Sequence, residues 1–187
     1  MVNTLLKPNA ELPDYLFTKD YATFYPFGVE MINNERNTFF LSLCRFLKNA
    51  GEKEFSIKHL GSIDFYLSGL GKNHERIFVE EFDRKFSTDL SVQAILDGLV
   101  LPSAPKLMFL ADFHKGIIHG TIGDWVIYFD RPLELLLVGI DKSLVNTFES
   151  FFLCEQVFND YYYQPIEKYT TMSNRERFEQ FKKNYHF

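Results

Sequence analysis

Residues 123–140 read GDWVIYFDRPLELLLVGI and carry the clearest fold signal in the chain. Two apolar runs flank Asp130-Arg131-Pro132, and a proline with its fixed φ angle suits a tight reversal. The segment therefore predicts an antiparallel hairpin, with Trp125, the only tryptophan, packed into the core of a sheet. The second run has few polar positions, so we expect that strand to be buried on both faces.

Strand patterns continue upstream of this hairpin. The runs KLMFLADF (106–113) and GIIHG (116–120) each end at turn residues and predict two more strands. Shorter runs between residues 54 and 82, separated by Gly61-Ser62 and by Gly71-Lys72-Asn73, predict a hairpin or meander. Together these segments predict a mostly antiparallel sheet built chiefly from residues 106–140 and 54–82, with a strand order that the sequence does not specify.

Helical periodicity appears on both sides of the strand segments. Phe39, Phe40, Leu43, Phe46 and Leu47 recur at steps of three and four residues and predict a helix over 34–50. Gly51 then stands where a left-handed C-cap belongs. A broad apolar arc predicts a second helix over 143–158 that packs on the sheet.

Two shorter helices are also expected. Residues 89–96 predict a short helix with Ser87, Thr88 or Asp89 as its N-cap. Residues 173–187 predict a terminal helix that opens with a capping box between Ser173 and Glu176. The fold class is therefore α+β, a single domain over residues 1–187 with two or three helices packed on the sheet.

The first thirty residues differ from the rest of the chain. Three prolines stand among six aromatic residues, a composition that favours an extended arm packed by its rings over regular secondary structure. We therefore expect residues 1–30 to be an ordered, irregular arm.

Composition excludes several classes of function. The 187 residues are 46% hydrophobic and 24% charged, which excludes a disordered chain. The formal net charge of −5 argues against binding nucleic acid through bulk charge. The longest apolar runs fall far short of the roughly 20 residues that span a bilayer, and residues 1–15 lack the apolar core of a secretion signal. We expect a cytoplasmic protein in which Cys44 and Cys154 are reduced, buried hydrophobes.

One group of residues suggests a metal site. In LADFHKGIIHG, Asp112 and His114 lie two residues apart, so on a strand they share a face, and a turn at Lys115-Gly116 can bring His119 back toward them. One carboxylate and two imidazoles are suitable ligands for a hydrolytic metal ion. The spacing matches no defined metal motif, and polar residues at strand ends are commonly just solvated.

Other features favour recognition of a protein. Asp124, Asp130 and Glu134 flank the predicted hairpin and are available for an acidic binding face. Tyr161, Tyr162 and Tyr163 are consecutive, so they cannot all face one core, and tyrosine is enriched at recognition surfaces. The chain contains no nucleophile elbow and no phosphate-binding loop. We therefore predict no catalytic residue and no cofactor.

The hairpin also carries a resemblance to a known class of proteins. Residues 123–131, followed by Glu134-Leu135, are similar to the tryptophan-bearing hairpin, with a W-x-x-Y-x-x-R core, of some bacterial immunity proteins of polymorphic toxin systems. The resemblance covers about twenty residues. It implies a cytoplasmic, cofactor-free protein of one domain that neutralises a toxin enzyme by covering its active site.

Three functional hypotheses follow. The first is a non-enzymatic protein-binding module, such as an immunity protein, whose negative charge suits a basic toxin enzyme as partner. The second is a small metal-dependent hydrolase centred on Asp112, His114 and His119. The third is a homo-oligomeric structural accessory protein in which the tyrosine run forms the interface.

Overall fold

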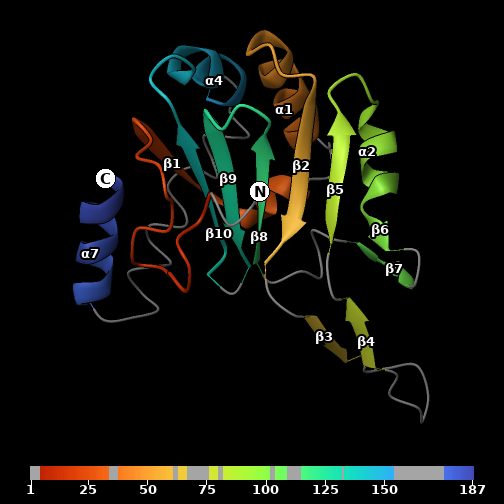
Figure 1. The fold of residues 1–187 in the computed structure, drawn as a ribbon, viewed down its shortest axis with the longest axis horizontal. Coiled ribbons are helices and arrows are strands. Elements are labelled where there is room, and N and C mark those ends of the chain that lie inside the picture. The colour runs from red at the N-terminus through yellow and green to blue at the C-terminus, as the bar shows by residue number, and fades with distance from the viewer. Residues whose placement is uncertain are drawn as a thin grey trace.

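The centre of the molecule is a six-stranded antiparallel sheet with the strand order β1-β10-β9-β8-β2-β5 (Figure 1). The computed structural model describes residues 5–33, 38–60, 63–66, 76–79, 82–101, 104–108, 115–131, 133–153 and 175–187. The sheet strands are β1 (Thr23–Gly28), β2 (Glu54–His59), β5 (Asp83–Ser87), β8 (Lys115–Gly120), β9 (Trp125–Asp130) and β10 (Leu135–Ile140). The helices are the 3-10 helix η2 (Val29–Asn33), α1 (Thr38–Asn49), α2 (Val92–Gly98), α4 (Val145–Phe152) and α7 (Arg175–Tyr185). This architecture confirms the α+β fold class.

The hairpin predicted from residues 123–140 is present as β9 and β10. The two strands pair antiparallel, from Trp125 opposite Ile140 to Asp130 opposite Leu135. Every residue of both strands is buried, and Trp125 is fully inaccessible. Leu136 and Val138 of β10 belong to the core under the helices, and Leu135 and Leu137 belong to the cluster on the other side of the sheet, so both faces of β10 are covered, as its apolar sequence predicts.

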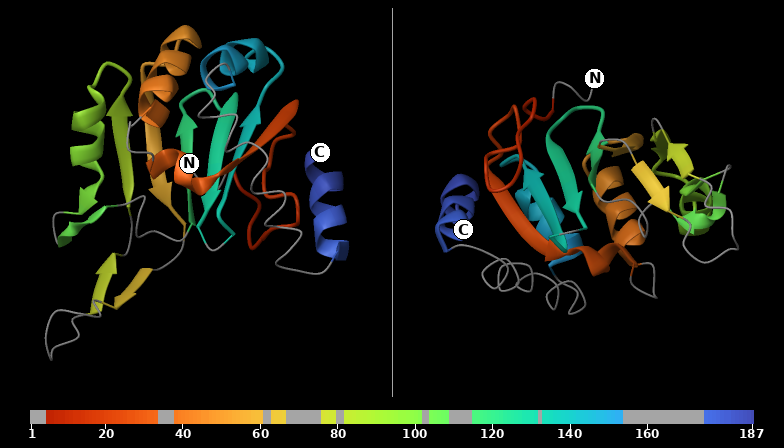
Figure 2. Two further views of the ribbon diagram at one scale, coloured as in Figure 1. Left: turned by 180° about the vertical axis from the view of Figure 1, so that it is seen from behind. Right: turned by 90° about the horizontal axis from the view of Figure 1, so that it is seen from below.

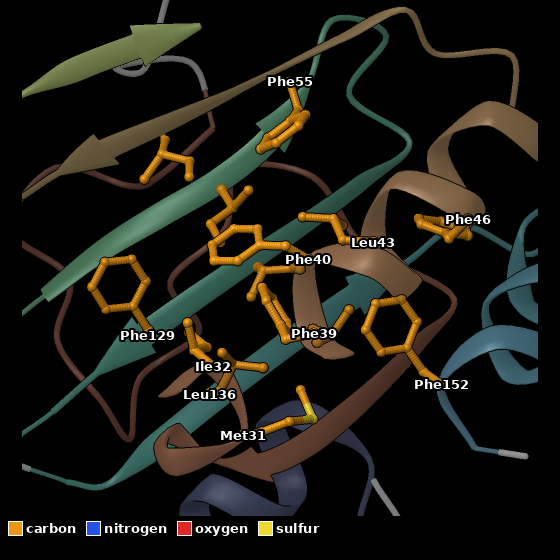
Figure 3. Packing of buried hydrophobic residues seen from close by; sticks show 14 of the residues in the cluster. Met31, Ile32, Phe39, Phe40, Leu43, Phe46, Phe55, Phe129, Leu136 and Phe152 are labelled. Atoms are coloured by element: carbon orange, nitrogen blue, oxygen red, sulfur yellow. The ribbon is translucent and has the colours of Figure 1, made fainter. Parts of the chain in front are cut away.

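Four helical segments cover one face of the sheet. The left view of Figure 2 looks onto this face, with η2 and α1 in front of the strands. Their side chains form an aromatic-rich core, part of which is shown in Figure 3, and Phe148 stacks on Phe152 with ring centroids 4.5 Å apart. Offset and edge-on ring pairs of this kind stabilise a core beyond simple area burial. Members of this core come from η2, α1, α2 and α4 and include Met31, Ile32, Phe39, Phe40, Leu43, Phe46, Ile95, Phe148 and Phe152.

The opposite face is covered in part by the two ends of the described chain. Residues 5–22 form an arm that packs with α7 over β1, β10, β9 and β8. The hydroxyl of Tyr185 donates to Asp14 O at 2.8 Å and accepts from Leu16 N at 3.0 Å. Phe24 packs edge-on to Tyr185, with ring centroids 5.0 Å apart. The arm and α7 therefore form one layer, held by rings and by hydrogen bonds between segments far apart in sequence.

The prediction of an irregular arm over residues 1–30 is wrong for residues 23–28, which form the edge strand β1. Val29 N donates to Glu134 O, and hydrogen-bonded residues alternate along an antiparallel pair. The backbone of Phe27 therefore faces β10, whereas Pro26 directs its hydrogen-free nitrogen outward. An edge strand is the one place in a sheet that tolerates such a proline.

Two regions contribute fewer described strands to the main sheet than predicted. β7 (Ala104–Met108) pairs with β6 (Val100–Leu101) in a separate two-stranded sheet, so the prediction that the 106–113 strand extends the main sheet is wrong for residues 106–108. Residues 109–113 lie outside the described residues. β3 (Ile63–Tyr66) and β4 (Arg76–Val79) likewise form their own pair. Of the described residues between 54 and 87, only those of β2 and β5 belong to the main sheet.

Helix ends follow the predicted caps in one case and depart from them in another. Gly51 has φ 80° after α1, which confirms the left-handed C-cap. The N-cap of α2 is Ser91, whose Oγ accepts from Ala94 N at 3.2 Å, and not one of the residues 87–89. Ser87 ends β5, and Thr88 donates its hydroxyl to Glu52 O, so neither is free to cap a helix. The proposed capping box at residues 173–176 lies outside the described side chains.

Among the residues that the structure describes, no helix combines the length and the apolar character needed to cross a bilayer.

Candidate functional site

The turn between β8 and β9, residues 121–124, places an apolar side chain in solvent. Ile122 is 62% exposed, more than Leu41 or Leu90, which are each 41% exposed. The next residue, Gly123, has φ 83°, a left-handed conformation that glycine adopts without strain. We call residues 121–124 the Ile122 turn.

Glu52 holds one side of the Ile122 turn. The Schellman-type end of α1, in which Glu52 N donates to Leu47 O at 2.9 Å, directs this residue back toward the sheet. Its carboxylate, 4% exposed as a residue, accepts from Thr121 Oγ at 2.6 Å and from the backbone N–H groups of Thr121 and Ile122, each at 3.3 Å. A buried carboxylate with three donors is a strong anchor. It fixes the first half of the turn.

Lys19 of the arm holds the other side. Its Nζ donates to Gly123 O at 3.2 Å, to Asp124 Oδ1 at 3.2 Å and to Asp141 Oδ2 at 2.5 Å. Burial lowers the pKa of Lys19, but the hydrogen bonds to Asp141 and Asp124 outweigh that effect, and the pKa is raised. The backbone N–H of Asp141 also donates to Asp124 O at 2.9 Å. The turn is therefore clamped from both sides while its apex stays in solvent.

Close packing beneath the turn requires a glycine. A Cβ at Gly120 would lie 2.1 Å from Glu52 Oε1 and 2.6 Å from Trp125 Nε1. Both contacts are shorter than real Cβ atoms allow, so Gly120 lets the carboxylate and the indole approach the same strand. Among the described residues, the buried Nε1 atom of Trp125 has no hydrogen-bond partner, and the ring packs against residues such as Phe46, with ring centroids 6.0 Å apart.

The predicted acidic face is divided between the two ends of β9. Asp124 lies before the strand, in the Ile122 turn, with its side chain 38% exposed. Asp130 ends the strand, and Glu134 follows in the β9–β10 turn with φ 52°. Six strand residues span about 20 Å, so Asp124 and Glu134 lie at opposite ends of the hairpin. Their use by one partner stays a prediction.

Asp130 is part of the interior of the fold. Its carboxylate accepts from Tyr128 OH at 3.0 Å and from Leu133 N at 3.3 Å, and Lys115 Nζ lies 3.5 Å away. The residue is 1% exposed, so the carboxylate is not available on the surface of the folded chain. Burial, with the neighbouring Asp130 charge, raises the pKa of the Tyr128 hydroxyl. Asp130 therefore stabilises, from inside the fold, the end of the hairpin at which β9 turns into β10.

The candidate metal ligands are only partly placed. His119 lies on β8, and its Nδ1 is 2.9 Å from Gly120 O. Since a carbonyl oxygen can only accept, Nδ1 carries the proton in this contact. Asp112 and His114 lie outside the described residues. Within the described ranges, no three His, Cys, Asp or Glu side chains are grouped so that they could hold a metal ion.

Of the remaining predicted residues, some are described by the structure and others are not. Tyr161, Tyr162 and Tyr163 lie outside the described residues, as does Cys154. Cys44 is buried in α1 as predicted, and burial raises the pKa of its thiol. Its environment is that of a core residue.

Sequence reasoning identified Asp124 but missed Ile122 and the two residues that hold the Ile122 turn from either side, Glu52 and Lys19. An isoleucine between Thr121 and Gly123 was a usable signal, because an apolar residue inside a turn has no strand face on which to be buried. Glu52 and Lys19 gave no such signal, since their contacts cross 70 and 105 positions of the chain.

Comparison with protein-family models, with curated proteins and with solved structures finds no significant match.

Proposed function

We propose that this chain is a non-enzymatic protein-binding module that recognises its partner through the Ile122 turn. The observation that carries the proposal is the combination of exposure and rigidity at Ile122. The side chain is 62% exposed, while Glu52 and Lys19 fix the backbone on either side of it. A preorganised apolar residue loses little conformational entropy on binding, which favours its use as an anchor in a partner's pocket.

The charge of the chain favours a basic partner. The formal net charge is −5, and the exposed side chain of Asp124 lies two residues from the apex of the turn. Opposite charge accelerates encounter and disfavours acidic competitors. A basic protein with an apolar pocket is therefore the partner that fits this surface.

The narrower form of the proposal is an immunity protein that neutralises a cognate toxin by binding it. This form is supported by the resemblance of the hairpin around Trp125 and by the position of the Ile122 turn directly before that hairpin. A convex, rigid tip suits insertion into a concave surface such as the active site of an enzyme.

The test compares three forms of the chain on one partner. Tagged wild-type chain, an Ile122→Asp variant and a Leu90→Asp variant are used to capture proteins from the source cells, and the recovered partner is then purified and titrated against each form. Leu90 is the matched control, because it is also an exposed apolar residue. We expect Ile122→Asp to weaken binding by about ten- to a hundred-fold, the value of one buried aliphatic side chain, and Leu90→Asp to bind as the wild type.

The immunity function requires a second readout. The purified partner's gene is expressed alone and together with each form of the chain. Growth arrest by the partner alone, relieved by the wild type and by Leu90→Asp but not by Ile122→Asp, supports the proposal. A partner that does not impair growth contradicts the immunity function, and equal binding of all three forms contradicts the use of the Ile122 turn.

A further inference from the structure

The sheet face that carries the arm has a second, polar half. Phe55 and Ile57 of β2 point into the core with the helices, so the alternate residues Ser56 and Lys58 point to the opposite face. On β5, Phe86 belongs to the same core, so Lys85 likewise points to the opposite face. Figure 1 looks onto this face: the arm and α7 lie toward β1, and no described helix lies in front of β2 or β5.

Strand register brings three different polar groups into one row across this half. Ser56 is the Cα partner of His119 on β8 and of Lys85 on β5. Directly opposed residues in antiparallel pairs have Cα atoms about 4.5 to 5.5 Å apart, so a hydroxyl stands between an imidazole and an ammonium group. We call His119, Ser56 and Lys85 the polar row.

The polar row retains unused hydrogen-bonding groups. Within the described part of the chain, the Ser56 hydroxyl and the Lys85 ammonium have no side-chain partner. His119 uses Nδ1 on Gly120 O, which leaves Nε2 without a described partner. Ser56 is only 8% exposed, so its hydroxyl lies at the floor of the row, whereas Lys85 is exposed.

The charges that surround the polar row are only partly paired. Lys58 lies in the adjacent row and forms an ion pair with Asp83 at 3.6 Å. Lys115, further along β8, is paired with Asp130. Lys85 and the exposed Glu54, one row away on the same face, form no ion pair with another described residue. The ammonium of Lys85 is therefore the cation of this half of the face that has no ion-pair partner among the described residues.

We propose that the polar row is a binding site for a phosphate group, either free or as a monoester. The Lys85 ammonium supplies charge and a donor, and the Ser56 hydroxyl supplies a second donor from the floor. Because Nδ1 of His119 donates to Gly120 O, Nε2 is an acceptor and can accept from a phosphate hydroxyl. A tetrahedral phosphate can therefore meet one group from each of three strands, and charge-assisted hydrogen bonds to it are strong. The site lies on β2, β5 and β8, and it does not depend on the Ile122 turn or on the protein partner.

The experiment is a titration of the full chain with inorganic phosphate at constant ionic strength, followed by backbone amide NMR. We expect saturable shifts at Ser56, Lys85 and His119. The variant Lys85→Gln should bind at least about ten-fold more weakly, the loss of one charge-assisted contact. Lys142→Gln is the matched control, since Lys142 is an exposed lysine outside these three strands and should leave the affinity unchanged.

Phenyl phosphate, titrated in the same way, distinguishes the source of the group. Tighter binding than that of inorganic phosphate identifies an organic monoester as the ligand, and equal or weaker binding identifies free phosphate. The absence of saturable shifts with both compounds overturns the proposal, and so does an equal loss of affinity in Lys85→Gln and Lys142→Gln. The amide spectrum of each variant shows directly whether the fold is retained.

Discussion

Replacing Glu52 with alanine should release the first half of the Ile122 turn. The carboxylate of Glu52 is the acceptor for the Thr121 hydroxyl and for two consecutive backbone N–H groups, those of Thr121 and Ile122. Alanine offers no acceptor there. The turn then keeps the attachments of its second half, from Lys19 to Gly123 and Asp124 and from Asp141 N to Asp124 O.

The magnitude follows from the three distances. The contact at 2.6 Å between Thr121 Oγ and Glu52 is a short, charge-assisted bond worth about 1.5 to 3 kcal/mol. The two backbone contacts at 3.3 Å are longer, and each contributes about 0.5 kcal/mol. Thr121 and Ile122 are exposed, so water can replace part of the lost hydrogen bonding in the variant. Removing a buried carboxylate also removes its desolvation cost. The net loss should be about 2 kcal/mol, a fall in melting temperature of about 4 to 8 °C for a chain of this size.

Urea unfolding of the wild type, Glu52→Ala and Glu54→Ala measures this change. Glu54 is the matched control, because it is a glutamate two residues away with an exposed side chain, and its loss should change stability by less than about 0.5 kcal/mol. Hydrogen exchange at the Ile122 amide should accelerate in Glu52→Ala beyond the global change. If Glu52→Ala is within about 0.5 kcal/mol of the wild type, the clamp does not hold the turn and the argument for a rigid anchor fails.

Three further substitutions or reactions follow from the structure. Lys19→Gln should lower the free energy of unfolding by at most about 1 kcal/mol, because the ammonium is partly exposed. Since the contacts of Lys19, above all with Asp141, raise its pKa in the folded state, this stability is present below pH 10.5 and is lost above it. A difference in unfolding free energy between variant and wild type that stays constant through that range refutes the ion pairs. In a Cys154→Ser chain, Cys44 should react with thiol reagents only as fast as the core opens, because burial raises the pKa of its thiol. Reaction at the rate of a small peptide thiol would contradict the burial of Cys44. Gly51→Ala should lower the free energy of unfolding by about 1 kcal/mol because φ there is 80°, and an unchanged urea midpoint would show that the C-cap carries no strain.

Local signals predicted the parts of the fold whose partners are close in sequence. The β9–β10 hairpin is formed by two apolar runs and one reversal, all within 123–140, so its residues contain the information for their own pairing. Helix α1 and its cap at Gly51 were predictable for the same reason. Residues 106–108 of the predicted 106–113 strand do lie in a strand, β7, but whether such a strand joins a large sheet or a small one depends on residues elsewhere in the chain.

Strand β1 and the candidate site depended on distant contacts. Pro26 argues against a strand in any window of the sequence, and it is compatible with one only because β1 is at the edge and the register turns its nitrogen outward. Asp124 could be predicted as a surface carboxylate, but its attachment to Lys19 joins residues 105 positions apart. Such contacts have no local pattern, so the clamp around Ile122 becomes visible only in three dimensions.

The layer formed by the arm and α7 determines when the chain can finish folding during its synthesis. All six sheet strands have been translated once Ile140 has emerged from the ribosome, but Tyr185 has not. Until it emerges, Phe17 and Phe24 lack the ring that packs against them at 6.4 and 5.0 Å. A chain in which α7 has not yet been synthesised therefore exposes aromatic rings of the arm and β1, and exposed apolar surface of this kind makes folding intermediates prone to aggregation. The packing of Phe181 and Tyr185 against these rings covers that surface.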